Sequence, residues 1–219
     1  MFTPFNDSTR EPAIHGFWHE PTRHTGNAIV LAHGAGANCQ SKLLVEMSNA
    51  LADAGFAVLR FDLPFRVARP QGPPHPGAAA RDRDGLRRAA TLMREKNHSH
   101  VFMGGHSYGG RQAMMLAAEE PRVADGLLLL SYPLHPPRKP EELRTNHFPK
   151  LTTPAFFIHG TRDLFATPAE MQSALALVPG PHAIMEVDGA GHDLLAKKAA
   201  GELPAQVAHK FKLFLELRE

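Results

Sequence analysis

Short apolar runs alternate with segments of helical periodicity along most of the chain. Six runs of strand length cover residues 28–32, 56–61, 100–104, 126–131, 155–159 and 183–187, and a weaker one lies near residues 13–19. Most are continuously apolar, as strands buried on both faces of a parallel sheet are. The alternation predicts an α/β fold in which a mostly parallel sheet is flanked by helices.

The segments between these runs are predicted helices. Thr167 can cap the start of one of them, Pro168 fits its first turn, and Glu170 can complete a capping box. Gly55 is placed to end an earlier helix, because glycine is favoured just beyond helix C-termini. Apolar faces at helical spacing are formed by Leu44, Met47, Leu51 and Ala54; by Leu86, Ala90 and Met93; by Ala113, Met114, Ala117 and Ala118; by Met171, Leu175 and Val178; and by Val207, Phe211 and Phe214.

Two proline-rich stretches, residues 64–76 and 132–154, are predicted to be loops at the rim of the sheet. The same strand and helix patterns resume after each of them, so residues 1–219 are expected to form a single domain. The second stretch, of about twenty residues, is too short for a large lid domain.

Charge and cysteine content narrow the classes of partner and compartment. Lys and Arg total 24 against 22 for Asp and Glu, and this net charge of +2 gives no reason to expect nucleic-acid binding. Cys39 is the only cysteine, which excludes an intrachain disulfide. Residues 1–20 lack the pattern of a signal peptide, and the longest apolar run, 127–130, is too short to cross a bilayer. We therefore expect a cytoplasmic protein without a membrane partner.

Arginine is concentrated in one part of the chain, which makes that part locally basic. The cluster comprises Arg60, Arg66, Arg69, Arg81, Arg83, Arg87, Arg88 and Arg94. We interpret it as a solvated loop and helix face, with a site for anionic groups near Arg66 and Arg69 as the alternative.

The sharpest chemical signal is a G-x-S-x-G motif formed by Gly105, Ser107 and Gly109, between a predicted strand and a predicted helix. A serine on a tight strand-to-helix turn has its hydroxyl exposed, and small neighbours are needed because a Cβ would crowd that turn. A serine hydroxyl is a weak nucleophile at neutral pH, so a base must take its proton and an acid must orient the base. Ser107 is therefore the predicted nucleophile.

An acid and a base follow downstream at the ends of two later strands. Asp163 comes just after the run 155–159, and His192 lies in the loop after the run 183–187. The order Ser, Asp, His is typical of α/β-hydrolases. Asp188 and Asp193 flank His192 and are the rival acids, but closeness in sequence does not direct a carboxylate at the imidazole ring. His98, His100 and His106 are interpreted as surface or packing residues.

The transition state of acyl transfer also needs two backbone N–H donors for its negative oxygen. One is expected from Tyr108, the residue after the nucleophile, and the other from the small-residue loop after the run 28–32, where Ala35 is the first choice and Gly36 the second. Arg111, one helical turn beyond Ser107, is expected to form a structural ion pair. Cys39 is interpreted as a packing residue. No metal or cofactor site is implied.

These motifs resemble the small hydrolases related to dienelactone hydrolase, a branch that includes relatives of a subunit of a human chromatin-modifying complex and of a testis-expressed hydrolase-like protein. The segments that carry the resemblance are HGAGAN, RFDLPF, GGHSYGGR, YPLHPPRKPEELR, FIHGTRD and GAGHD. The resemblance implies an α/β-hydrolase fold of seven or eight strands with Ser107, Asp163 and His192 as the triad. Dienelactone hydrolases proper use a cysteine where this chain has Ser107, so lactone hydrolysis does not carry over.

The sequence thus predicts a serine hydrolase that cleaves a carboxylic ester or thioester of a small molecule through an acyl-enzyme at Ser107. Without a large lid, its site is expected to be shallow and to favour small or protruding acyl groups. Two alternatives remain open: a non-catalytic interaction protein that keeps the fold, and an acyltransferase, which would share every residue named above.

Overall fold

A computed structural model describes residues 2–194 and 201–217 of the chain. Its centre is an eight-stranded sheet with the strand order β1-β2-β4-β3-β5-β6-β7-β8. Strands β3 to β8 pair in parallel, whereas β1 and β2 pair antiparallel at one edge. The mostly parallel sheet predicted from the apolar runs is therefore confirmed.

The strands are β1 (Phe2–Asp7), β2 (Ile14–His19), β3 (Asn27–Ala32), β4 (Ala57–Phe61), β5 (His100–His106), β6 (Leu127–Leu130), β7 (Ala155–Gly160) and β8 (His182–Val187). Strand β1 was not predicted, because its side chains are exposed or half-buried and its sequence, with Pro4, lacks an apolar run. An edge strand of this kind obtains its order from backbone pairing with β2, which a pattern of side chains does not reveal.

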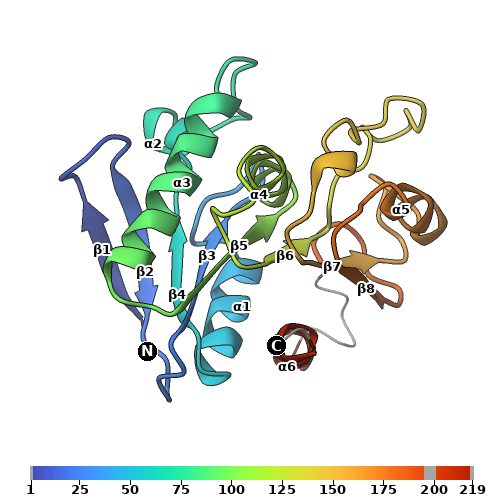
Figure 1. The fold of residues 1–219 in the computed structure, drawn as a ribbon. Helices are drawn as coiled ribbons and strands as arrows, with labels where there is room; N and C mark the ends of the chain where they lie inside the picture. Colours follow the sequence, from blue (N-terminus) through green and yellow to red (C-terminus); the bar gives the residue numbers. More distant parts are fainter. Residues whose placement is uncertain (1, 195–200, 218–219) are drawn as a thin grey trace.

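Helices cover both faces of the sheet (Figure 1). On one face lie α1 (Lys42–Asp53) and α6 (Leu203–Glu216). On the other lie α2 (Pro64–Ala68), α3 (Ala79–Glu95), α4 (Tyr108–Glu119) and α5 (Pro168–Leu175). Each face has its own cluster of buried apolar side chains, so the sheet separates two hydrophobic cores.

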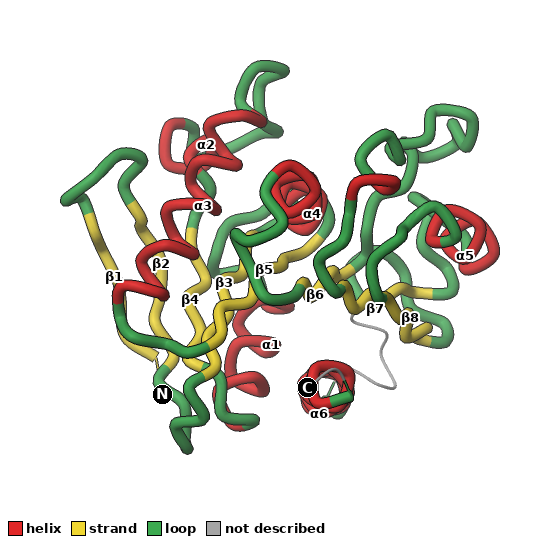
Figure 2. The backbone as a smooth tube through the Cα atoms, viewed as in Figure 1, coloured by secondary structure: helices red, strands yellow, loops and turns green. Residues whose placement is uncertain are grey.

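The predicted caps are present, and one predicted loop is partly helical. The Thr167 hydroxyl accepts from the Glu170 N–H, and the Glu170 carboxylate accepts from the Thr167 N–H, which completes the capping box of α5. Gly55 follows α1 with a φ of 102°. The stretch 64–76 was predicted to be a loop throughout, but it begins with α2, where Pro64 occupies the first turn. The stretch 132–154 is mostly loop, with only the short 3₁₀ helix η1 (Phe148–Lys150) in it (Figure 2).

The expectation that the arginine-rich stretch forms a solvated face is wrong for three of its members. Arg60, Arg66 and Arg88 are only 1%, 6% and 7% exposed. The Arg60 guanidinium lies over the rings of Phe2 and Phe17 and donates to the Cys39 carbonyl at 2.6 Å, while Arg88 forms a salt bridge with Asp7. Arg60 and Arg88 thereby connect β1, at the edge of the sheet, to distant segments through Phe2 and Asp7, although the Nε and Nη1 of Arg88 are buried without a hydrogen-bond partner.

We expect Phe211→Ala to lower the free energy of unfolding by about 3–5 kcal/mol, because it leaves a cavity under α6. Phe211 is fully buried, and its ring centroid lies 5.9 Å from that of Phe56 and 5.7 Å from that of Phe102. Urea denaturation followed by circular dichroism measures the loss. Leu213→Ala on the same helix is the matched control, since Leu213 is 44% exposed. An equal loss in both variants would contradict the packing described.

Candidate active site

Ser107 lies between the end of β5 and the start of α4, with a φ of 52° that few non-glycine residues adopt. The turn is possible only because the residues two positions before and after Ser107 are glycines. A Cβ on Gly105 would lie 2.2 Å from the Ala32 carbonyl oxygen, and a Cβ on Gly109 would lie 2.6 Å from the His33 carbonyl oxygen. The two glycines therefore let the end of β3 approach the serine turn, and strain is concentrated at Ser107.

The structure brings Ser107, Asp163 and His192 together from three separate loops. The His192 Nε2 lies 2.8 Å from the Ser107 Oγ, and the His192 Nδ1 lies 2.8 Å from the Asp163 Oδ2. A carboxylate only accepts hydrogen bonds, so Nδ1–H donates to Asp163 and the lone pair of Nε2 faces the serine hydroxyl. This tautomer can take a proton from Ser107.

Asp163 is the aspartate that contacts the His192 ring. Its side chain is fully buried, and its second oxygen accepts from the Phe165 N–H at 2.8 Å. Asp188 instead accepts from the Thr161 hydroxyl at 3.3 Å. The parallel pairing of β7 and β8 explains why Asp163 and His192 meet, because it places the residues after these two strands at the same edge of the sheet.

The loop after β3 faces the serine turn and contains both candidates for the second N–H donor. Ala35 and Gly36 are the middle residues of a turn in which the Ala37 N–H donates to the Gly34 carbonyl at 3.1 Å. His33 is fully buried; its Nδ1–H donates to the Gly34 carbonyl and its Nε2 accepts from the Leu63 N–H. Burial lowers the pKa of His33, which keeps this ring neutral. The geometry does not separate Ala35 from Gly36.

Arg66 stabilises the same loop from outside. Its guanidinium donates to the carbonyls of Ala35 at 2.9 Å and Ala37 at 2.7 Å, and also to those of Arg69 and Gly72. The alternative that Arg66 binds an anionic group is therefore not supported, since four backbone carbonyls already accept from it. Sequence reasoning missed this role, because nothing in the local pattern links position 66 to the loop after β3.

Residues 25–213 match the family model described as the alpha/beta hydrolase domain. The chain belongs to this α/β-hydrolase family. Its fold is similar to that of Est1E from Butyrivibrio proteoclasticus with bound ferulic acid, at a TM-score of 0.79 and 15% identity over 98% of this chain and 100% of that one. It is also similar to a dienelactone hydrolase from Anabaena variabilis, at a TM-score of 0.75 and 22% identity over 97% of each chain. The predicted α/β-hydrolase fold is thus confirmed.

Two side chains that sequence reasoning did not assign to the site support it in this α/β-hydrolase. His106 is not a bland packing residue: its Nε2–H donates to the His192 carbonyl at 2.7 Å. The ring of Phe165 stacks on the ring of His192, with centroids 4.1 Å apart. His192 is therefore fixed through both its backbone and its ring. The only sequence signal for this role of His106 was its position next to Ser107 in the chain.

Asp82 links three helices beneath the serine turn. Its carboxylate accepts from the Tyr108 hydroxyl at 2.7 Å and from the Phe65 N–H at 2.9 Å. The side chain is fully buried, and burial raises the pKa of its carboxyl. These bonds fix the start of α4, where the Tyr108 N–H has no partner within the helix.

Cys39 is buried in the structure, as a packing residue would be, and burial raises the pKa of its thiol to about 12.

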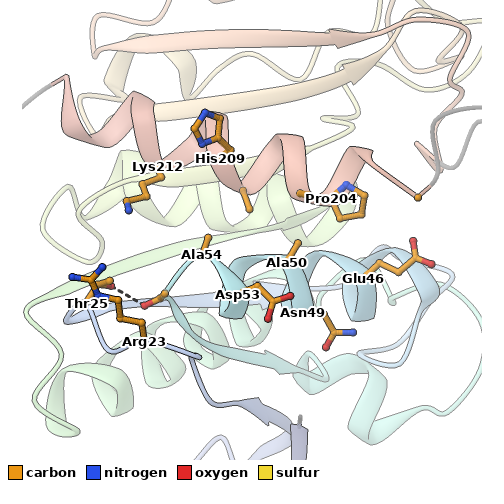
Figure 3. A pocket seen from close by; sticks show the side chains of 14 residues that line it. Arg23, Thr25, Glu46, Asn49, Ala50, Asp53, Ala54, Pro204, His209 and Lys212 are labelled. Carbon is orange, nitrogen blue, oxygen red and sulfur yellow. Dashed lines mark hydrogen bonds between the residues drawn. The ribbon is translucent and has the colours of Figure 1, made fainter.

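A separate cavity of about 820 Å³ lies between α1 and α6 (Figure 3). Its walls carry Glu46 and Asp53 opposite His209 and Lys212. None of Ser107, Asp163 and His192 lines this cavity, so it is not part of the candidate active site. No helix in the described ranges is long and apolar enough to cross a membrane.

We expect the pH dependence of stability to become shallower in His106→Gln. Burial lowers the pKa of His106 to about 4, so between its ordinary value near 6.5 and 4 the unfolded chain binds a proton there and the folded chain does not. Stability is therefore lost as the pH falls through this window, by up to about 3 kcal/mol for this group. Glutamine does not titrate and removes that part.

Urea unfolding at pH 7 and pH 4.5 measures the effect, with His209→Gln on the exposed side of α6 as the control. The difference in unfolding free energy between the two pH values should shrink in His106→Gln and stay as in the wild type in His209→Gln. An unchanged difference in His106→Gln would contradict the burial of a neutral imidazole at this position.

Proposed function

We propose that this α/β-hydrolase is a serine hydrolase that cleaves a carboxylic ester or thioester through an acyl-enzyme at Ser107. One observation carries the proposal: the His192 ring lies at 2.8 Å from both the Ser107 hydroxyl and the Asp163 carboxylate. This is the contact pattern of a nucleophile, a general base and the acid that orients the base.

The proposed reaction has two halves. The Ser107 Oγ attacks the carbonyl carbon while His192 Nε2 takes the hydroxyl proton, and the Asp163 carboxylate stabilises the resulting imidazolium. The imidazolium then gives its proton to the leaving alcohol or thiol, which leaves an acyl group on Ser107. Water attacks this acyl group with His192 again as the base, and the carboxylic acid and free Ser107 are released.

The negative oxygen of each tetrahedral intermediate would accept from two backbone N–H groups. Tyr108 is the proposed first donor, because its N–H is at the start of α4 and has no intrahelical acceptor. Ala35 remains the first choice for the second donor and Gly36 the alternative. The bonds from Arg66 to the carbonyls of this loop favour the role, since they fix the loop without using its N–H groups.

The substrate class follows from what covers the site. Between β6 and β7 the chain forms loop and the three-residue helix η1, with no helical lid (Figure 2). Ser107 and His192 are partly exposed. These features favour small or protruding acyl groups over long lipid chains. Ferulic acid bound to the similarly folded Est1E is in keeping with a compact acid as the product.

Labelling with a fluorophosphonate probe tests the proposed nucleophile. We expect covalent modification of the wild type and none in Ser107→Ala, while Ser173→Ala on the exposed face of α5 labels normally. The Ser173 hydroxyl donates to the Ala169 carbonyl and no base contacts it, so it is a matched serine control. A folded wild type that does not label would instead favour a non-catalytic interaction protein.

We expect faster hydrolysis of p-nitrophenyl acetate than of p-nitrophenyl palmitate, because the site is open. We also expect kcat to fall roughly 10⁴-fold in Asp163→Asn, because the amide stabilises the wrong imidazole tautomer. Initial rates at pH 7.5 measure both. Preference for the palmitate ester would contradict the open site. Transfer of the acetyl group to an added alcohol at the expense of acetate, followed by chromatography, would instead identify an acyltransferase.

A further inference from the structure

A second cavity, of about 280 Å³, lies between α4 and the segment 143–150. Its charged and polar lining comes from Arg111, Glu119, Arg144, Asn146, His147 and Lys150. None of Ser107, Asp163 and His192 lines it. The lining is therefore mainly basic and separate from the serine site.

The charge of Arg111 is not neutralised by the protein. The predicted structural ion pair is wrong: across the described parts of the chain Arg111 forms no salt bridge, and its Nε is buried without a hydrogen-bond partner. Glu119, the one acid in the lining, pairs with Arg83 at 3.4 Å instead. A guanidinium charge that no carboxylate neutralises is costly in a partly buried place, so the basic cavity is suited to an anion from outside.

Arg144 lines the same cavity, and its charge is likewise not neutralised by a salt bridge among the described residues. Its guanidinium donates to the Pro133 carbonyl at 3.3 Å. Burial lowers the pKa of Arg144, and the nearby Arg111 charge lowers it further. Two cationic groups thus approach each other in a partly buried place, where like charges repel more strongly than in water.

The positions of these groups are fixed by the loop itself. The Tyr132 hydroxyl donates to the Arg144 carbonyl at 3.0 Å and accepts from the His147 Nε2–H at 3.0 Å. Burial and the Arg111 charge lower the pKa of His147 to about 4. The imidazole is therefore neutral at pH 7, and the positive charge of the cavity comes from Arg111, Arg144 and Lys150.

We propose that this cavity binds an oxyanion group, a phosphate or a carboxylate, with Arg111 and Arg144 as its ligands. Guanidinium groups match both anions because they can donate two parallel hydrogen bonds. A bound anion would neutralise part of the charge of Arg111 and Arg144 and would screen the repulsion between the two guanidinium groups. The proposal does not depend on the chemistry of Ser107.

Isothermal titration calorimetry at pH 7.5 tests it with inorganic phosphate and, separately, with acetate, at ionic strength matched by NaCl. We expect saturable binding of at least one of them, and the anion that saturates identifies the class of ligand. Arg111→Gln and Arg144→Gln should each weaken binding about tenfold or more, as expected for loss of a charge-assisted hydrogen-bond donor. Arg122→Gln, at an exposed position outside the cavity, should not.

NMR titration of the histidine rings gives a second readout that separates anion binding from a change in folding. A bound anion should raise the pKa of His147 above 4, because a nearby negative charge favours the imidazolium. Arg111→Gln should also raise this pKa, and further anion should then have little effect. The proposal fails if neither anion saturates the wild type, or if Arg122→Gln weakens binding as much as the cavity variants.

Discussion

The close approach of two backbone segments is the constraint on which the site depends. The end of β3 and the turn between β5 and α4 come together so tightly that a Cβ at Gly105 or Gly109 would overlap a carbonyl oxygen. Only this approach allows the loop with Ala35 and Gly36 to face Ser107. The two glycines of the motif are therefore steric requirements, and their spacing around the serine follows from the geometry of the turn.

Buried polar residues around this contact fix the loops that carry Ser107 and His192. Arg66 and His33 hold the loop after β3, Asp82 holds the start of α4, and His106 holds the backbone of His192. Each of them is buried or nearly so, and each has a partner far away in the sequence. Loops gain the rigidity of the sheet in this way, because breaking any one of these bonds leaves a buried polar group without a partner.

Arg66 and Arg111 differ in how the protein satisfies their guanidinium groups. Arg66 donates to four backbone carbonyls, so its charge is dispersed over the loop that it stabilises. Arg111 has a buried Nε without any such acceptor and lies near a second arginine. Backbone contacts account for the position of Arg66, whereas no carboxylate among the described residues forms a salt bridge with Arg111.

The sequence by itself determined the features that depend on local pattern. Continuous apolar runs identified β3 to β8, Thr167 and Glu170 identified the start of α5, and the motif around Ser107 with the order Ser, Asp, His identified the three residues that meet. Only the tertiary structure decided the pairing of β1, the burial of Arg60 and Arg66, the contact of His106 with His192 and the burial of the Arg111 Nε without a hydrogen-bond partner. The physical reason is range: periodicity and capping act within a few residues, whereas the partner of a buried polar group comes from segments that meet only when the sheet has formed.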